Sequence, residues 1–381
     1  MINQSDVELR LWSEREFETG RGEWQELLAS SHADKLFLSW AWMYSWWQLW
    51  ARSGTDELYL QAAYYQGELV GIAPCYIEKT HYFAKLLPIK RLHFIGHRHS
   101  RGGGLRSEYL GPIVRSDLEA SVSVLLAEAI FCNPRWDEAI LSDLVREGVF
   151  HRLLKDQSRL NNYPIRVLDA SICYSVNTID KFDQYKEKRG RNTRLKLFGR
   201  RKLLAEYGRI ELVSGDSVDV GTVMDSIDEF HHIRFKSTTF TDKRRALVRR
   251  LVSNGSGSDI QCTSSLLQLD GETLSAMLNL SVAGKVYNIQ LGYVENFDKK
   301  ISLGTLHLGY AIEEAFNNPG IHSFDFLAGE GKNSDYKKRL AELESTLESI
   351  MVIRNPVLKI AYRFNDWLKE LSKKKAVAKT A

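Results

Sequence analysis

Helical and strand-like patterns of hydrophobic residues alternate along the chain and predict its helices and strands. Residues 36–50, LFLSWAWMYSWWQLW, hold five of the nine tryptophans at helical spacing, so we expect a buried helix there. Residues 57–79 contain two apolar runs on either side of Gln66-Gly67-Glu68, which is typical of a β-hairpin. The first half is therefore predicted to run from a core helix into a hairpin.

The second half repeats this order. Residues 265–294 predict three strands joined by turns at Asp270-Gly271-Glu272 and Ala283-Gly284-Lys285. Helical patterns at residues 218–235 and 243–253 precede them. The shared order predicts a duplicated α/β unit with a mixed sheet, divided near residues 165–185.

A helix and a strand follow the third predicted strand. Residues 299–316 have helical spacing, Ser302 and Thr305 are suited to capping the start, and Pro319-Gly320 ends it. Gly304 would let a ligand approach the unpaired amides at this helix start, which is where a pyrophosphate binds well. Ordinary helix capping explains the same residues. Residues 321–327 then read as a buried strand that runs into a polar loop.

Composition restricts the class of protein. With 381 residues, 44% hydrophobic and 26% charged, the chain fits a soluble globular protein of two domains. No apolar run reaches the length of a membrane span, and the first residues lack the pattern of a signal peptide, so we expect a cytoplasmic protein. The four cysteines lie far apart, which indicates neither a disulfide framework nor a metal site.

Positive charge is concentrated in a few segments. Residues 188–202, KRGRNTRLKLFGRRK, hold eight cations and no acid, and a second basic run spans residues 243–250. Such runs indicate an anionic partner (cofactor phosphates, RNA or a membrane surface) or simply solvated helix faces. Residues 355–375 predict a basic amphipathic helix. We expect it to dock on its own domain, with peripheral contact at the inner face of the membrane as the alternative.

Several motifs together resemble a known family. They are the basic stretch 188–202, Phe230-His231-His232-Ile233-Arg234, the double hairpin, Ser302-x-Gly304-Thr305, and Asp325-Phe326-Leu327-x-Gly329 followed by Tyr336-Lys337. Their order resembles the CelD-like (cellulose biosynthesis protein CelD) acyltransferases of the GNAT superfamily. The resemblance implies tandem GNAT-like domains related to Fem-type transferases. The loop from Glu330 to Asp335 is longer than is usual in the family, which implies an acceptor of different size or shape.

This resemblance implies domain boundaries and a function. We expect an N-terminal GNAT-like domain over residues 1–170, a C-terminal GNAT domain with the donor site over 171–354, and a basic helix and tail over 355–381. The implied activity is acyl transfer from acyl-CoA or acetyl-CoA, without a metal, to an amine or hydroxyl of a lipid, glycan or other small cell-envelope precursor. A Fem-like transferase using aminoacyl-tRNA is one alternative, and only there is nucleic acid a partner. An inactive scaffold in exopolysaccharide production is the other.

Candidate site residues follow from these motifs. His231 is the candidate general base because imidazole titrates near neutral pH, although a structural histidine fits equally well. Tyr336 would protonate a leaving thiolate, and Lys337 would hold an anionic substrate group, although surface residues at the start of a helix fit both positions equally well. The expected donor contacts are Ser302, Gly304, Thr305, Arg191 and Arg194. The expected substrate contacts are Arg234, Asp325 and Glu330. No nucleophilic Cys or Ser motif is visible.

Overall fold

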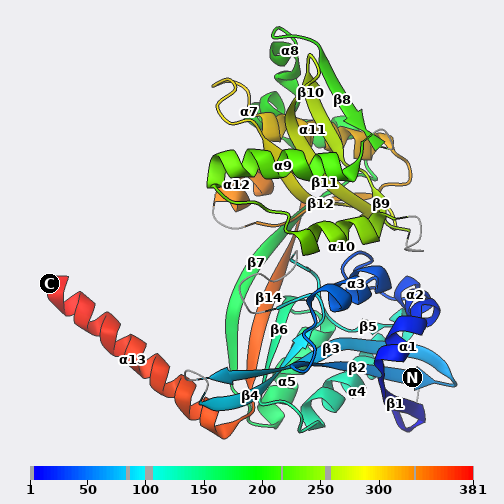
Figure 1. The fold of residues 1–381 in the computed structure, drawn as a ribbon, viewed down its shortest axis with the longest axis vertical. Coiled ribbons are helices and arrows are strands. Elements are labelled where there is room, and N and C mark those ends of the chain that lie inside the picture. Colours follow the sequence, from blue (N-terminus) through cyan, green and yellow to red (C-terminus); the bar gives the residue numbers. More distant parts are fainter. Residues whose placement is uncertain are drawn as a thin grey trace.

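The chain folds into two α/β bodies that share one sheet. The computed structural model describes residues 4–82, 86–98, 106–215, 218–253, 259–329 and 332–380. Figure 1 shows the N-terminal body below and the C-terminal body above, joined by two long strands, β7 (Ile165–Asn177) and β14 (Leu343–Ile353). Helix α13 (Pro356–Thr380) projects from the lower body.

Fourteen strands form the mixed sheet. Its main path runs β1-β2-β3-β4-β6-β14-β7-β13-β12-β11-β10-β8, with β5 paired to β3 and β9 to β11. The other strands are β1 (Val7–Trp12), β2 (Asp56–Tyr65), β3 (Glu68–Tyr82), β4 (Leu87–Phe94), β5 (Ile113–Val114), β6 (Glu138–Val145), β8 (Ile210–Ser214), β9 (Gln261–Cys262), β10 (Ser265–Leu269), β11 (Glu272–Val282), β12 (Lys285–Tyr293) and β13 (Ser323–Ala328). The predicted α/β fold with a mixed sheet is confirmed.

Helices cover this sheet. They are η1 (Gln4–Asp6), α1 (Glu14–Thr19), α2 (Arg21–Ala29), α3 (Trp40–Trp50), η2 (Ser116–Leu118), α4 (Glu119–Cys132), α5 (Val149–Leu160), α6 (Phe182–Lys188), α7 (Arg191–Arg194), the π-helical turn η3 (Leu195–Gly199), α8 (Arg201–Leu204), α9 (Val220–Phe235), α10 (Asp242–Val252), α11 (Leu303–Asn317) and α12 (Lys332–Leu340). Helices α3, α9, α10, α11 and α13 lie where the hydrophobic spacing predicts them.

The predicted hairpin turns are also confirmed. Each has two consecutive residues with positive φ: 53° and 83° at Gln66-Gly67, 51° and 88° at Asp270-Gly271, and 48° and 75° at Ala283-Gly284. Two-residue turns of this handedness match the twist of antiparallel strands, and glycine at the second position adopts them at little cost. Short-range sequence therefore determines these three connections.

The two halves repeat one topology. In the N-terminal half, β4 and β6 pair in parallel over 91–93 and 138–140. In the C-terminal half, β12 and β13 pair in parallel over 285–287 and 323–325. A helix connects the parallel strands in each case, α4 in the first half and α11 in the second. The predicted duplication is confirmed by this shared arrangement.

The halves exchange their last strands. Strand β7 follows the N-terminal half in sequence but pairs with β13 of the C-terminal half, whereas β14 pairs with β6 of the N-terminal half. The two exchanged strands also pair with each other, from Leu343 opposite Ser175 to Val352 opposite Ile165. The expected division between residues 170 and 171 falls inside β7, so neither half completes its sheet alone.

Helix α3 packs inside the protein, as predicted. Trp42 and Trp46 are fully buried, and the hydrophobic cluster around them extends to Leu247 and Leu251 of α10 and to Leu327 of β13. The two halves therefore share part of one core as well as the sheet. The four cysteines are free, in agreement with their spacing.

Candidate functional site

A large cavity opens where two parallel strands separate. Beyond Tyr287 and Asp325, β12 and β13 are no longer paired with each other. A cavity of about 1250 Å³ lies between them, lined by residues 288–291 of β12 and 326–329 at the end of β13. The outer edges of these strands pair with β11 and β7, and the inner edge of β12 faces the cavity, where an extended ligand can pair with it.

The equivalent opening in the N-terminal half is occupied by the chain itself. Leu110 forms a parallel bridge with Leu144 of β6, and its amide donates to the Asp143 carbonyl at 3.0 Å. Since the other edge of β6 is paired with β14, Leu110 lies on the edge that faces β4. The cavity of the C-terminal half is therefore not duplicated at this place.

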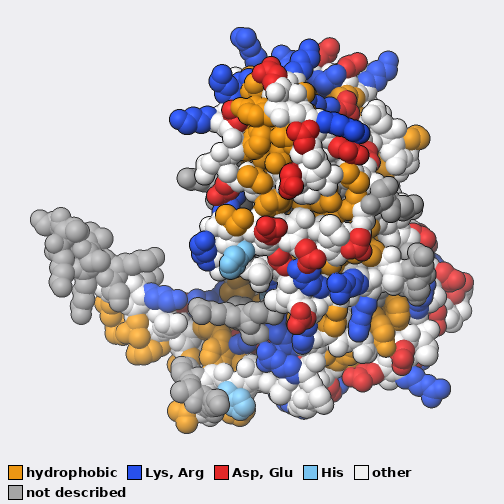
Figure 2. All heavy atoms as spheres, turned by 45° about the horizontal axis from the view of Figure 1, so that its top comes forward, with side chains coloured by type: hydrophobic (Ala, Val, Ile, Leu, Met, Phe, Trp, Pro, Cys, Tyr) orange, Lys and Arg blue, Asp and Glu red, His pale blue; other side chains and the backbone are white. Residues whose placement is uncertain are grey.

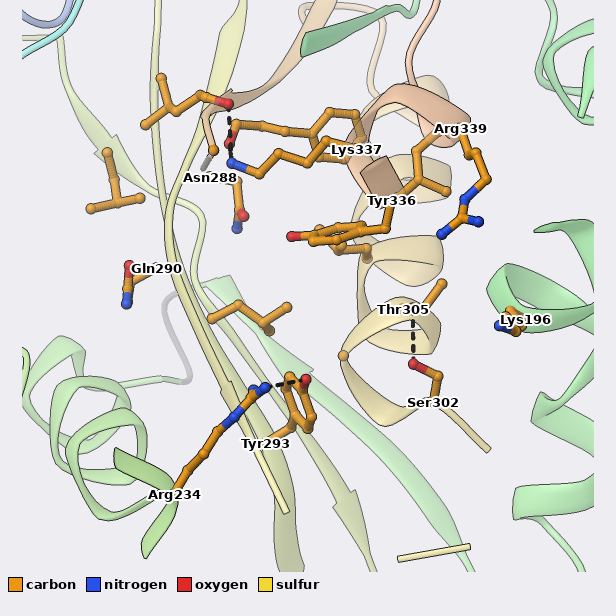
Figure 3. A pocket seen from close by; sticks show the side chains of 18 of the residues that line it. Lys196, Arg234, Asn288, Gln290, Tyr293, Ser302, Thr305, Tyr336, Lys337 and Arg339 are labelled. Atoms are coloured by element: carbon orange, nitrogen blue, oxygen red, sulfur yellow. Dashed lines mark hydrogen bonds between the residues drawn. The ribbon is translucent and has the colours of Figure 1, made fainter. Parts of the chain in front are cut away.

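Helix α11 begins at this cavity. Ser302 is its N-cap residue, but the Ser302 hydroxyl hydrogen-bonds to the Thr305 hydroxyl at 3.0 Å and not to a helix amide (Figure 3). Amides of the first turn therefore remain for a ligand, at the positive end of the helix dipole. Gly304 packs against Tyr293, because a Cβ at this position would lie 2.7 Å from the ring. The three expected donor residues of this turn line the cavity together.

The cavity wall is strongly basic. Its cationic residues are Arg106, Lys196, Arg200, Arg234, Arg244, Lys299, Lys300, Lys337 and Arg339, and its acidic residue is Glu108. Figure 2 shows Lys and Arg side chains projecting around the top of the C-terminal body, with Asp and Glu side chains among them. A wall of this charge favours a ligand that carries phosphates.

The basic segment faces the cavity with a different side from the one expected. Arg191 and Arg194 are exposed and do not line the cavity, whereas Lys196 and Arg200 do. Leu197, which is fully buried, determines which side of this segment faces the protein. Its carbonyl oxygen lies so close to Gly309 of α11 that a Cβ there would be 2.1 Å away.

A bulge at the end of β13 aims main-chain groups at the inner end of the cavity. Leu327 has a φ of 59°, and the pairing with β7 skips between Asp325 and Ala328. The Leu327 amide donates to Asp325 Oδ1 at 2.7 Å, and the Ala328 amide donates to Glu108 Oε2 at 2.9 Å. These two carboxylates hold the bulge, since a residue with positive φ needs such support.

Asp325 acts within the protein and does not line the cavity. Its carboxylate accepts from Tyr109 at 2.7 Å and pairs with Lys285 at 2.8 Å. Burial lowers the pKa of Lys285, but Asp325 and Asp34 outweigh this and raise its pKa overall. The expected substrate contact is thus part of a buried ion-pair cluster between the two halves.

Glu108 is the titratable group that sequence reasoning missed. It comes from the N-terminal half, is only 3% exposed, and lies at the wall of the C-terminal cavity. Burial raises the pKa of Glu108 to about 7, against the opposing influence of the Arg106 guanidinium. A carboxyl group with this pKa can accept or release a proton at neutral pH. The only local signal is a charged residue in the segment SEYLGPIV, residues 107–114.

Lys337 supports the bulge through its ammonium group. Its Nζ donates to the carbonyls of Phe326, Leu327 and Ala328 at 2.6, 3.0 and 2.9 Å. An ammonium group has three donors, so this set is complete. Burial lowers the pKa of Lys337. The side chain lines the cavity, but its donors are directed at the strand end (Figure 3).

His231 lies in the wall with both ring nitrogens engaged. Nε2 is 3.1 Å from the Leu291 carbonyl and Nδ1 is 2.5 Å from the Thr239 hydroxyl. A carbonyl only accepts, so Nε2 carries the proton and Nδ1 accepts from Thr239. This arrangement matches the structural alternative for His231. Arg234 also lines the cavity, where it pairs with Glu295 at 2.8 Å.

Tyr336 reaches into the cavity. Figure 3 shows its phenol extending from α12 across the cavity towards β12. Burial raises the pKa of Tyr336 to about 12, so the phenol keeps its proton at neutral pH. Glu330, the remaining expected substrate contact, lies outside the described residues. Within the described ranges, no cluster of His, Cys, Asp and Glu could hold a metal ion.

Comparison with known proteins assigns the fold of this region. Residues 191–338 match a family described as "Acetyltransferase (GNAT) domain". This segment is therefore similar to GNAT acetyltransferase domains, a kind of domain that uses acyl-CoA donors. The match indicates acyl transfer in general and does not identify the acceptor. The matched family is not the CelD-like family. No curated protein sequence matches the chain.

Several solved structures align with most of the chain. The structure of FemX is 12% identical, has a TM-score of 0.60, and covers 92% of this chain and 98% of its own. A tandem GNAT protein from the clavulanic acid biosynthesis pathway has 13% identity and a TM-score of 0.43, covering 90% and 98%. The C-terminal domain of a putative lysylphosphatidylglycerol synthetase from Agrobacterium fabrum has 10% identity and a TM-score of 0.46, covering 90% and 93%. The FemX likeness means a shared fold over nearly the whole chain.

Proposed function

We propose that the protein transfers an acyl group from acyl-CoA to an amine or hydroxyl of a cell-envelope precursor. The observation that carries this proposal is the open separation of β12 and β13, which has the start of α11 at one side and Glu108 at its inner end. A thioester could bind in this opening with the atoms to be exchanged near two groups that transfer protons.

The cavity suits the donor in three respects. The unpaired edge of β12 can pair with the amides of a pantetheine arm as an added strand would. The first turn of α11, with Ser302, Gly304 and Thr305, would hold the pyrophosphate. Lys196, Arg200, Lys299 and Lys300 supply cations from neighbouring elements for the remaining phosphate.

Two side chains would move protons. Glu108, as the carboxylate, takes the proton from the acceptor amine or hydroxyl while the new C–N or C–O bond forms at the acyl carbon. Tyr336 gives its proton to the sulfur as the C–S bond breaks, and the phenol is then reprotonated from solvent. The Ala328 amide lies beside Glu108 and, together with Lys337, keeps the strand end rigid around the reacting atoms.

The donor assignment can be measured directly. Calorimetric titration with CoA and acetyl-CoA should give one site per chain. Release of free thiol should appear only with a suitable acceptor, which lipid and glycan extracts from a deletion strain would identify by mass spectrometry. Absence of CoA binding at millimolar concentration would overturn the proposal and favour the inactive scaffold of exopolysaccharide production.

A second donor is favoured by one observation. Lys337 and Arg234 are paired within the protein, but the other cations of the cavity wall, with Arg191 and Arg194 exposed next to them, still exceed what one CoA needs. Aminoacyl-tRNA carries an extended phosphate chain that could use them. Binding of RNA should weaken steeply as salt rises, because each phosphate contact releases counterions, whereas CoA binding should change much less. A filter-binding series over salt with each ligand separates the two donors.

A further inference from the structure

Helix α13 is attached to the protein along one face. Leu358 is 1% exposed in a cluster with Ile89 and Met351. One turn on, the Tyr362 hydroxyl donates to Glu138 at 2.9 Å, and another turn on Arg166 donates to Asp366 at 2.6 and 2.8 Å. Because these positions are spaced by four, they form a single line along the helix.

The opposite face is apolar and exposed. Val357, Ile360, Phe364 and Trp367 are 53%, 69%, 58% and 53% exposed. With 100° of rotation per residue, their mean direction is about 180° from the attached line. Figure 1 shows α13 projecting away from the body, and Figure 2 shows hydrophobic side chains along this arm. The helix therefore docks on its own domain through the line of Leu358, Tyr362 and Asp366, and the described residues leave the opposite apolar face uncovered.

One border of the apolar face is basic. Lys359 and Arg363 lie on that side, Lys369 lies on the attached side near Asp366, and the sequence continues with Lys373-Lys374-Lys375 and Lys379. The acidic Asp366 is already paired with Arg166. A helix with an apolar aromatic face and a basic border has the chemistry of a segment that lies in the surface of an anionic bilayer. No helix in the described ranges is long and apolar enough to cross a bilayer.

A neighbouring hairpin contacts the attached line of α13. Tyr82, at the end of β3, packs its ring against Tyr362 with centroids 5.9 Å apart. Leu86, just before β4 in the same hairpin, is 84% exposed. The start of α13 and the hairpin end therefore lie together, and both present apolar side chains.

We propose that the apolar face of α13 docks the protein on the surface of an anionic lipid bilayer. The face inserts Ile360, Phe364 and Trp367 at the level of the headgroups, while Arg363 at its border contacts lipid phosphates. A second copy of the chain is the less favoured occupant, because two basic borders would meet across such an interface. This inference is independent of the transferase chemistry.

Vesicle sedimentation with the full chain tests this. Vesicles of phosphatidylcholine with roughly 30 mol% phosphatidylglycerol should bind the protein, and pure phosphatidylcholine should bind it much less. The triple variant Ile360→Ala, Phe364→Ala, Trp367→Ala should lower partitioning by at least about tenfold, because apolar insertion is lost while alanine preserves the helix. Arg363→Gln should cost about fivefold in binding on anionic vesicles only.

A matched pair of single variants provides the control. Ile360→Ala should weaken binding, whereas Ile179→Ala, which is 75% exposed in the other half of the protein, should leave it unchanged. Equal loss in both, or no binding to either vesicle, would overturn the proposal. So would a dimer in sedimentation velocity without lipid that the triple variant converts to a monomer, since the face would then belong to a second copy.

Discussion

The carboxylate of Glu108 accepts a hydrogen bond from the main-chain amide of Ala328 at 2.9 Å, although the two residues belong to different halves of the chain. This contact joins a segment of the N-terminal half to the bulged end of β13. The cavity is therefore completed by both halves, and the N-terminal half contributes a titratable group where its own equivalent opening is filled by Leu110.

The first prediction concerns the pH dependence of activity. If Glu108 removes the acceptor proton, kcat/KM should fall by tenfold per pH unit below about 7, where the carboxylate becomes protonated. Glu108→Gln should lower kcat by roughly 10²- to 10⁴-fold and abolish this acidic limb. The exposed Glu272→Gln is the matched control and should keep the wild-type profile. A Glu108→Gln enzyme with full activity would exclude the residue as the base.

The same residue predicts a change in stability. Burial raises the pKa of Glu108 to about 7 from the ordinary 4.5, so the folded protein binds this proton more tightly than the unfolded chain does. Its contribution to stability is therefore complete below pH 4.5 and is lost as pH rises through 7. Glu108→Gln cannot ionise. At pH 8 it should be more stable than the wild type by about 3 kcal/mol, and at pH 4.5 nearly equal.

Urea unfolding at the two pH values measures this difference. A carboxylate that stabilises the protein through Arg106 and the Ala328 amide would give the opposite sign, with Glu108→Gln less stable at pH 8. The two outcomes thus differ in direction as well as size.

Local sequence determines much of the fold but not the exchange of strands. The turns at Gln66-Gly67 and Asp270-Gly271 need backbone conformations that glycine favours, so the hairpins can be predicted from a few residues of sequence. The exchange of β7 and β14 depends on pairing between residues as distant as Ile165 and Val352. Either half could offer its edge to either strand, and no local pattern distinguishes the two.

The site shows the same limit. The first turn of α11 is expected from one short motif and Tyr336 from another, and the residues of both line the cavity. The sequence predicts the basic segment, but the side of it that faces the cavity depends on how Leu197 packs against Gly309. Cations lie on every side of this segment, so the sequence alone does not indicate which of them face the cavity. Glu108 was missed because its partner, Ala328, is 220 residues away in sequence.

The third prediction concerns Lys337. Lys337→Met would leave three main-chain carbonyls at the end of β13 without their donor, so we expect a loss of roughly 2–4 kcal/mol in unfolding free energy together with loss of activity. Lys338→Met, whose side chain is 66% exposed, is the adjacent control and should change stability by less than about 0.5 kcal/mol. A Lys337→Met protein that unfolds normally but is inactive would instead indicate direct contact with substrate.

The fourth prediction separates Tyr336 from its neighbour. Tyr336→Phe removes only the hydroxyl that extends across the cavity, so melting temperature and CoA affinity should remain close to wild type. The turnover number should fall by about 10²-fold, because the thiolate then leaves without its proton donor. Pre-steady-state measurement of thiol release should show the slowed step. Wild-type turnover in this variant would remove Tyr336 from the chemistry.

The last prediction tests the start of α11 through Gly304 and Tyr293. A methyl group at position 304 would lie 2.7 Å from the Tyr293 ring and 3.3 Å from Leu291, so Gly304→Ala must displace the ring. The displaced ring would enter the space beside the first turn and disturb the hydrogen bond of 3.1 Å between Arg234 and the Tyr293 hydroxyl. We expect the Kd for CoA to rise about tenfold, which is roughly 1.4 kcal/mol.

Gly22→Ala is the matched control in helix α2, because no atom lies within 4 Å of a Cβ there. It should leave CoA binding unchanged. Equal CoA affinity in the folded Gly304→Ala protein and the wild type would show that the donor's phosphates do not bind at this helix.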